Sequence, residues 1–188
     1  MGRDVNLGSP REPDTLLERI METGEVAAKE IAESKIFTTM AVKALAASTD
    51  YAAEDILTDA AGGAFIFNLP EPGEIIKAIA FCSVTALTPQ ITLYLFNEQP
   101  AGTFTDNAAN TNPTIGNSLI CDGWIDFLAL EDLGGVSASL VTVGTYGNLG
   151  MVISAPNKRL WGIPVTRQAI TGETANMILG FKLWVRKD

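Results

Sequence analysis

The sequence predicts an all-β fold: an antiparallel β-sandwich, jelly-roll-like, preceded by an N-terminal arm and one α-helix. From residue 35 onward, short apolar runs alternate with clusters of Gly, Pro, Asn and Asp, which is the pattern of strands joined by turns. No helical period separates these runs, and this argues against a fold of alternating strands and helices. A chain of 188 residues can bury one proper core, so a single sandwich domain over 35–188 is expected.

Strand-like runs follow one another through this domain. They cover residues 36–47, 64–69, 74–86, 90–97, 119–128, 139–145, 150–154, 160–166 and 176–186. The last run alternates most clearly, because Met177, Phe181 and Val185 fall on one face and Trp184 on the other. Pro164 has no N–H for a ladder, so the 160–166 run is expected at an edge or a bulge. A jelly roll is the expected topology.

The run from Gln90 to Asn97 is apolar on both of its faces. Ile91, Leu93 and Leu95 can line the sandwich core, whereas Tyr94 and Phe96 point the other way. A sheet with one face in water would carry polar residues at those two positions. We therefore expect the second face to be covered, either by sister copies or by a protein layer beneath them.

The first 34 residues differ in composition from the rest. Residues 1–13 mix Gly, Pro, Arg and Asp, which is typical of a flexible arm. A capping box at Thr15–Glu18 then predicts a helix as far as about Glu33. Its apolar stripe includes Leu16, Leu17 and Ile20. An isolated helix of this length is marginal, so the stripe is expected to dock on the domain or on a neighbour, or to form a helix bundle.

Charge and hydropathy exclude several partners. The net charge is −9, and there is no Lys or Arg between Lys77 and Lys158, which disfavours direct nucleic-acid binding. No apolar run reaches the roughly 20 residues that span a bilayer, so no membrane partner is expected. The chain is nevertheless 47% hydrophobic, and the surplus apolar surface is expected in oligomer contacts. The first residues lack the apolar core of a secretory signal, which favours assembly in a cytoplasm.

The search for chemistry is mostly negative. Histidine is absent, which excludes a Ser-His-Asp or Cys-His arrangement, and there is no Walker loop. We therefore expect no enzyme, and no catalytic, cofactor or metal site. Cys82 and Cys121 are too few for a zinc site and are expected as small buried hydrophobes, or as a disulfide if their strands are neighbours.

Two alternatives remain open from the residues. The loop from Asp106 to Asn112 is rich in oxygen ligands that suit Ca²⁺, although Asx residues are also ordinary in turns. Trp124, Trp161 and Trp184 could form a carbohydrate platform if they are exposed, but core or interface positions are commoner for such residues.

Several segments of the chain resemble a known family. They are TDYAAED at 49–55, LYLFN at 93–97, TFTDNAA at 103–109, LWG at 160–162 and VTR at 165–167. Over roughly residues 36–188 the chain is similar to auxiliary head proteins of tailed bacteriophages, the capsid decoration or cement type. The resemblance implies a structural virion protein with a β-sandwich body, often trimeric, that binds the major capsid protein on the outer surface of the capsid.

The expected function is therefore capsid decoration by a homotrimer. Interface positions are expected in the N-terminal helix and on the aromatic strand faces. They are Leu16, Leu17, Ile20, Tyr94, Phe96, Phe104, Trp161 and Trp184. The alternatives are a receptor- or glycan-binding module of a head fibre or tail spike, and a head-completion protein.

Overall fold

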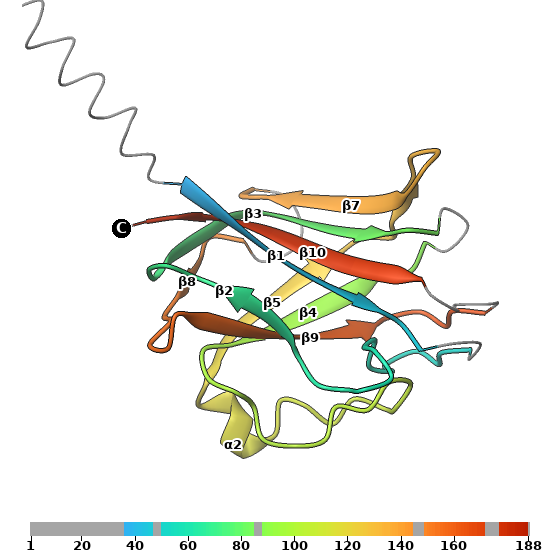
Figure 1. Ribbon diagram of the computed structural model, residues 1–188, viewed down its shortest axis with the longest axis horizontal. Coiled ribbons are helices and arrows are strands. Elements are labelled where there is room, and N and C mark those ends of the chain that lie inside the picture. The colour runs from blue at the N-terminus through green and yellow to red at the C-terminus, as the bar shows by residue number, and fades with distance from the viewer. Residues whose placement is uncertain (1–35, 47–49, 85–87, 145–148, 172–176, 188) are drawn as a thin grey trace, which may run out of the picture. The chain divides into compact units, whose positions relative to one another are not determined.

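The structure is a computed structural model that describes residues 36–46, 50–84, 88–144, 149–171 and 177–187. Its fold consists of two antiparallel β-sheets (Figure 1). The first sheet has the order β1 (Ile36–Ala44), β10 (Ile178–Arg186), β3 (Gly73–Cys82), β7 (Ser137–Thr142) and β6 (Glu131–Asp132), with β8 (Met151–Ile153) pairing with β3. The second sheet has the order β2 (Phe65–Asn68), β9 (Arg159–Thr166), β4 (Ile91–Phe96) and β5 (Cys121–Phe127). The predicted arm and helix, with Leu16, Leu17 and Ile20, lie outside the described residues.

The strand order is that of a jelly roll. Strands β1, β10, β3 and β7 lie side by side in one sheet, and β2, β9, β4 and β5 lie side by side in the other. The chain therefore crosses between the sheets after β1, β2 and β3, forms the β4–β5 pair within one sheet, and crosses back. Two Greek keys interleaved in this way define the jelly-roll topology. The predicted fold class, an antiparallel β-sandwich, is confirmed.

All the strand-like runs in the sequence correspond to strands, but β6 and the short helix α2 (Ile115–Ser118) were not predicted. These two elements have two and four residues, too few to show a period. The edge position expected for the 160–166 run is wrong, because β9 lies between β2 and β4. Pairing with β2 ends at Gly162, and the carbonyl of Pro164 accepts the Leu57 N–H at 3.0 Å. The proline nitrogen points to that same side, so no ladder bond to β4 is lost.

The core lies between the sheets and follows the predicted alternation. Phe181 of β10 is fully buried, and its ring contacts Phe65 of β2 with centroids 5.2 Å apart and Phe127 of β5 at 5.7 Å. One side chain of the first sheet therefore packs against strands at both edges of the second. Such aromatic contacts contribute beyond the burial of their area.

The cysteines are both free thiols in different sheets, Cys82 in β3 and Cys121 in β5. Burial raises the pKa of both thiols. The disulfide considered from the sequence is therefore absent, and Cys82 is a small buried side chain of the core, as expected.

Asp122 connects the two sheets at one end of the sandwich. Its carboxylate accepts hydrogen bonds from Asn97 Nδ2 at 2.7 Å and from the Ser154 N–H, which follows β8, at 3.2 Å. Burial raises the pKa of this carboxyl, and the two hydrogen bonds lower it by a smaller amount. The folded protein consequently holds this proton more tightly than the unfolded chain does.

Replacing Asp122 by Asn is expected to change how stability depends on pH. A carboxyl whose pKa is raised on folding contributes stability that is fully present below its unfolded pKa and is lost as pH rises through the folded pKa. The unfolding free energy of the wild type minus that of Asp122→Asn should therefore fall between about pH 3 and about pH 7. Urea unfolding of both proteins across this range measures the difference. A difference that rises with pH would contradict the assignment.

Candidate functional site

Three of the expected interface residues are buried by the chain itself. Phe96, Phe104 and Trp161 lie with Ile56, Ile163 and Val165 in a second apolar cluster on the outer side of the second sheet. Ile56 forms a β-bridge with Val165, and the Ile56 N–H donates to the Ala108 carbonyl at 2.9 Å. The second face of the 90–97 run is thus covered, as expected. The expectation that sister copies or a protein layer beneath them cover it is wrong for these residues, because the chain's own loops do so.

The other two expected residues in the described part of the chain do not share a surface. Tyr94 lies on the outer face of the second sheet, and Trp184 lies on the outer face of the first. Both are partly buried. Tyr94 and Trp184 therefore cannot belong to one continuous surface of the same copy, since the thickness of the sandwich separates them.

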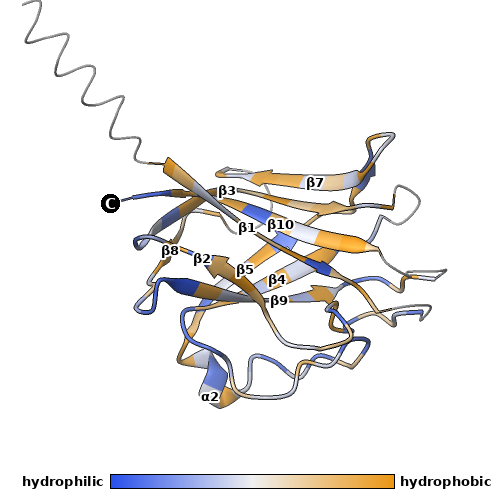
Figure 2. Ribbon diagram, viewed as in Figure 1, coloured by the Kyte–Doolittle hydropathy of each residue, from blue (hydrophilic) through white to orange (hydrophobic). Residues whose placement is uncertain are grey.

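The outer face of the first sheet is the apolar surface that the described residues leave uncovered. Met40, Lys182, Ile79 and Leu140 form one row across β1, β10, β3 and β7, and three of the four are apolar. Figure 2 shows the hydrophobic stretch of β7 in which Leu140 lies. Met40 is 57% exposed and Leu140 is 54% exposed. Contiguous exposed apolar surface of this kind marks an interaction site. The outer face of the first sheet is therefore a candidate interface.

Two further rows of this face carry aromatic rings: Gly180 lies beside Phe81 in one, and Trp184 lies beside Lys77 in the other. A Cβ atom on Gly180 would lie 2.2 Å from Phe81 Cζ, so the Phe81 ring lies across the glycine backbone. The Trp184 ring is flanked by Lys77 Nζ at 4.6 Å and by Lys182 Nζ at 4.8 Å from its centroid. Cation–π attraction holds both lysines on the ring. The sequence alternation had predicted that Trp184 lies on the face opposite Phe181, and the buried Phe181 and partly exposed Trp184 confirm it.

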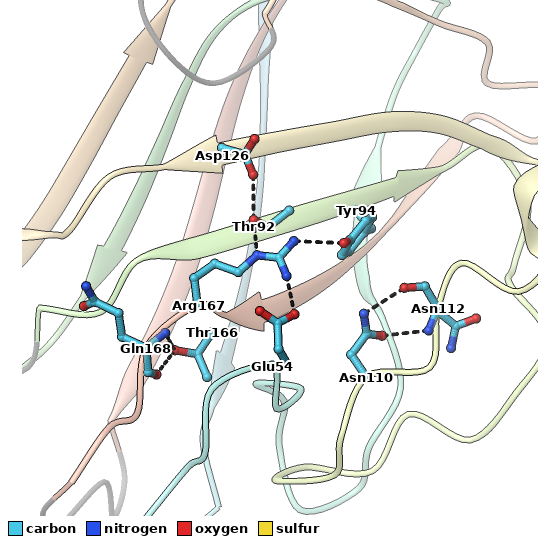
Figure 3. A network of polar contacts seen from close by, with 9 residues as sticks. All are labelled: Glu54, Thr92, Tyr94, Asn110, Asn112, Asp126, Thr166, Arg167 and Gln168. Atoms are coloured by element: carbon cyan, nitrogen blue, oxygen red, sulfur yellow. Dashed lines mark hydrogen bonds and ion pairs between the residues drawn. The ribbon is translucent and has the colours of Figure 1, made fainter.

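A polar network lies on the outer face of the second sheet, where β9 ends. Figure 3 shows Arg167 between Thr92, Tyr94 and Glu54. Its Nε donates to Thr92 Oγ1 at 2.8 Å, its Nη2 donates to the Tyr94 hydroxyl at 2.9 Å, and its Nη1 contacts Glu54 Oε2. Thr92 in turn donates to Asp126 Oδ1 at 2.6 Å. Burial lowers the pKa of Arg167, but Tyr94 and the two acids outweigh it, so the net pKa is raised and the guanidinium stays charged.

The position of Glu54 is set by its backbone. Its φ of 73° is unusual for a residue with a side chain. The conformation is held because the Glu54 N–H donates to the Thr166 carbonyl at 2.7 Å and the Glu54 carbonyl accepts the Asn110 N–H at 2.8 Å. Strained residues of this kind persist only where the surroundings determine them. Here they place a carboxylate against Arg167.

The segments that carry the family resemblance meet on this side of the sandwich. Asp106 accepts hydrogen bonds from the Tyr51 hydroxyl at 2.7 Å and from the Thr58 N–H at 2.8 Å. The Asn110 side chain bonds the backbone N–H and carbonyl of Asn112, and the Asn112 side-chain oxygen accepts from Asn117 Nδ2 of α2 at 2.6 Å. These oxygens hold the turn together, which is the turn interpretation of this loop. Within the described ranges, no group of three or more acidic or cysteine side chains could hold a metal ion.

A cleft of about 880 Å³ opens between the 59–66 segment and the 99–105 loop. Its lining includes Lys43, Asp59, Phe104, Arg159 and Trp161. Lys43 Nζ lies at 2.8–3.2 Å from four oxygens, those of Thr58, Asp59, Gly62 and Gly63. The Lys43 ammonium group therefore stabilises the 58–63 segment that lines the cleft.

Comparison with known proteins adds no relative. No family model matches the sequence, and no curated protein matches it significantly. In the described part of the chain, no helix has the length and apolar character needed to cross a membrane. The residues of the Arg167 network were not predicted as a site, since Glu54 and Arg167 are 113 positions apart. The only signal in the sequence was that both lie in the segments of the family resemblance.

Proposed function

We propose that the protein is a structural component of a tailed-phage head, a decoration protein that binds the outer surface of the major capsid protein lattice as a homotrimer. The observation that carries the proposal is the exposed apolar outer face of the first sheet, which contains Met40 and Leu140. The family resemblance supplies the phage setting. Repeated copies of a modest contact suit such a protein, because many weak contacts made together give high avidity.

The outer face of the first sheet is assigned to contacts between copies. The two central strands of this face, β10 and β3, each pair with a neighbouring strand on both sides. The face is therefore a rigid, twisted sheet surface and not a loop. Met and Trp, which this face carries as Met40 and Trp184, are among the residue types enriched at protein interfaces. Residues 1–34, whose apolar stripe includes Leu16 and Ile20, are assigned to the major capsid protein.

The test introduces charge on this face. In Met40→Glu/Leu140→Glu, each carboxylate would be buried in the trimer contact, so the variant is expected to be a monomer with head occupancy reduced at least about tenfold. Light scattering should give three times the 20.0 kDa chain mass for the wild type. Quantitative mass spectrometry of purified heads measures occupancy. Leu119→Glu is the matched control, since Leu119 is exposed next to α2 and away from this face.

Two results would overturn the proposal. One is a wild-type protein that stays monomeric and is missing from purified heads. The other is a charged double variant that decorates heads as fully as the wild type. A chain beginning at residue 35 distinguishes the contacts between copies from the contact of residues 1–34 with the major capsid protein. It should form trimers and yet show reduced head occupancy. A copy number that corresponds to a single ring would indicate a head-completion protein.

A further inference from the structure

An exposed tryptophan lies beside the polar network on the outer face of the second sheet. Trp124 of β5 is 46% exposed, and its ring centroid is 6.3 Å from that of Tyr94 on the neighbouring strand. The guanidinium carbon of Arg167 lies 5.8 Å from the Tyr94 centroid. Trp124, Tyr94 and Arg167 therefore form a line across β5, β4 and the end of β9.

The polar groups along this line have unused hydrogen-bonding capacity. Arg167 has five N–H groups, of which three have acceptors among the described residues. The Tyr94 hydroxyl accepts from Arg167, and its own hydrogen has no acceptor in the described part of the chain. Glu54 is mostly exposed, and of its two oxygens only Oε2 is engaged by a described residue. Free donors of Arg167 and Tyr94 and a free acceptor of Glu54 thus lie on the Tyr94 side of the Trp124–Tyr94 pair.

We propose that this surface binds a neutral carbohydrate, with a pyranose ring stacked on Trp124. A pyranose has an apolar C–H face, which matches an indole face, and a rim of hydroxyls, each both donor and acceptor. Hydroxyls of the next sugar unit along the line can accept from Arg167 and donate to Glu54, which already lie in contact.

The charge of the site selects against acidic sugars. The Arg167 charge is balanced by Glu54, and Asp126 adds a further negative charge nearby. The chain as a whole carries −9, so it repels a polyanion at long range. The backbone of Arg167 is also fixed, because its N–H donates to the Gln90 carbonyl at 2.8 Å. A site that is rigid before binding loses little entropy when it binds.

The experiment uses the full-length protein and an array of immobilised neutral oligosaccharides that end in glucose, galactose, mannose or N-acetylhexosamine. Calorimetry with the best free oligosaccharide is expected to give a Kd of about 1 mM or tighter. Trp124→Ala should weaken binding at least about tenfold, and Glu54→Gln should weaken it while leaving the stacking surface intact. Leu133→Ala is the control, because Leu133 is also exposed but lies in the turn between β6 and β7 of the other sheet.

Each outcome decides the inference. Binding that requires Trp124 and Glu54 but not Leu133 supports it. Absence of binding to every neutral oligosaccharide at about 10 mM, binding confined to acidic sugars, or equal affinity in Trp124→Ala would overturn it. In the last case the network serves only to hold the Glu54 segment on β9. Head occupancy of Trp124→Ala should equal that of the wild type, so this test is independent of the capsid proposal.

Discussion

Phe181→Ala is expected to lower the free energy of unfolding by about 3–5 kcal/mol. Phe181 is fully buried between Phe65 and Phe127, which belong to the opposite sheet. Removing its ring leaves a cavity between two sheets whose positions are fixed by their own hydrogen bonds, so the space cannot close. The loss is a large part of the roughly 5–15 kcal/mol that stabilises a domain. Urea unfolding followed by near-ultraviolet circular dichroism measures it.

Phe81→Ala is the matched control for this prediction. Phe81 is also a phenylalanine of the first sheet, but it lies on the outer face and is only partly buried. Its truncation is expected to cost about 1 kcal/mol. Equal losses in the two variants would contradict the assignment of Phe181 to the centre of the core. If Phe181→Ala does not fold, Phe181→Leu provides a measurable intermediate case.

Gly62→Ala is expected to cost about 2–5 kcal/mol, from two effects that act together. Gly62 has a φ of 75°, a left-handed conformation that disfavours any side chain. In addition, a Cβ atom there would lie 2.6 Å from the carbonyl oxygen of Phe104. That oxygen belongs to the backbone and accepts the Gly63 N–H at 2.8 Å, so it has little room to move. Thermal or urea unfolding gives the loss.

The neighbouring glycine separates the two effects. Gly63 has a φ of 83°, but a Cβ atom there would meet nothing within 4 Å. Gly63→Ala should therefore cost only the conformational part, about 1–2 kcal/mol. A loss in Gly63→Ala that matches the loss in Gly62→Ala would show that the close approach of the 59–66 segment to the 99–105 loop contributes nothing. The shape of the cleft between these segments depends on that approach.

The two outer faces of the sandwich differ because the connections are unequal. The loops around Ile56 and Phe104 bury the apolar residues of the second sheet and leave a polar network with an exposed Trp124 at one end. Among the described residues, no such segment lies over Met40 and Leu140 on the first sheet. One side is therefore suited to contact with another protein surface, and the other side to a small polar ligand.

Local patterns in the sequence were enough to predict the fold class and the inward residues of the two runs that became β4 and β10. Alternation depends only on neighbouring positions, so Phe181 and Trp184 could be assigned to opposite faces of one strand, and the turn residues marked where strands end. The number of strands and the absence of helices between them indicated a sandwich, of which the jelly roll was the expected topology, and the strand order agrees with it. The two-residue strand β6 and the short helix α2 escaped prediction because they hold too few residues for a pattern.

What covers an apolar face could be learned only from the folded chain. The sequence showed that the Phe96 side chain has to be covered. Loops of the same chain cover it, and no local pattern distinguishes this arrangement from cover by a sister copy. The pairing of Glu54 with Arg167 likewise depends on the segment around Ile56 lying beside β9, and no local pattern in the sequence specifies a contact between such distant positions. The face of each strand residue is set by the two-residue period of the chain, whereas the partners of that face arise when distant segments are brought together.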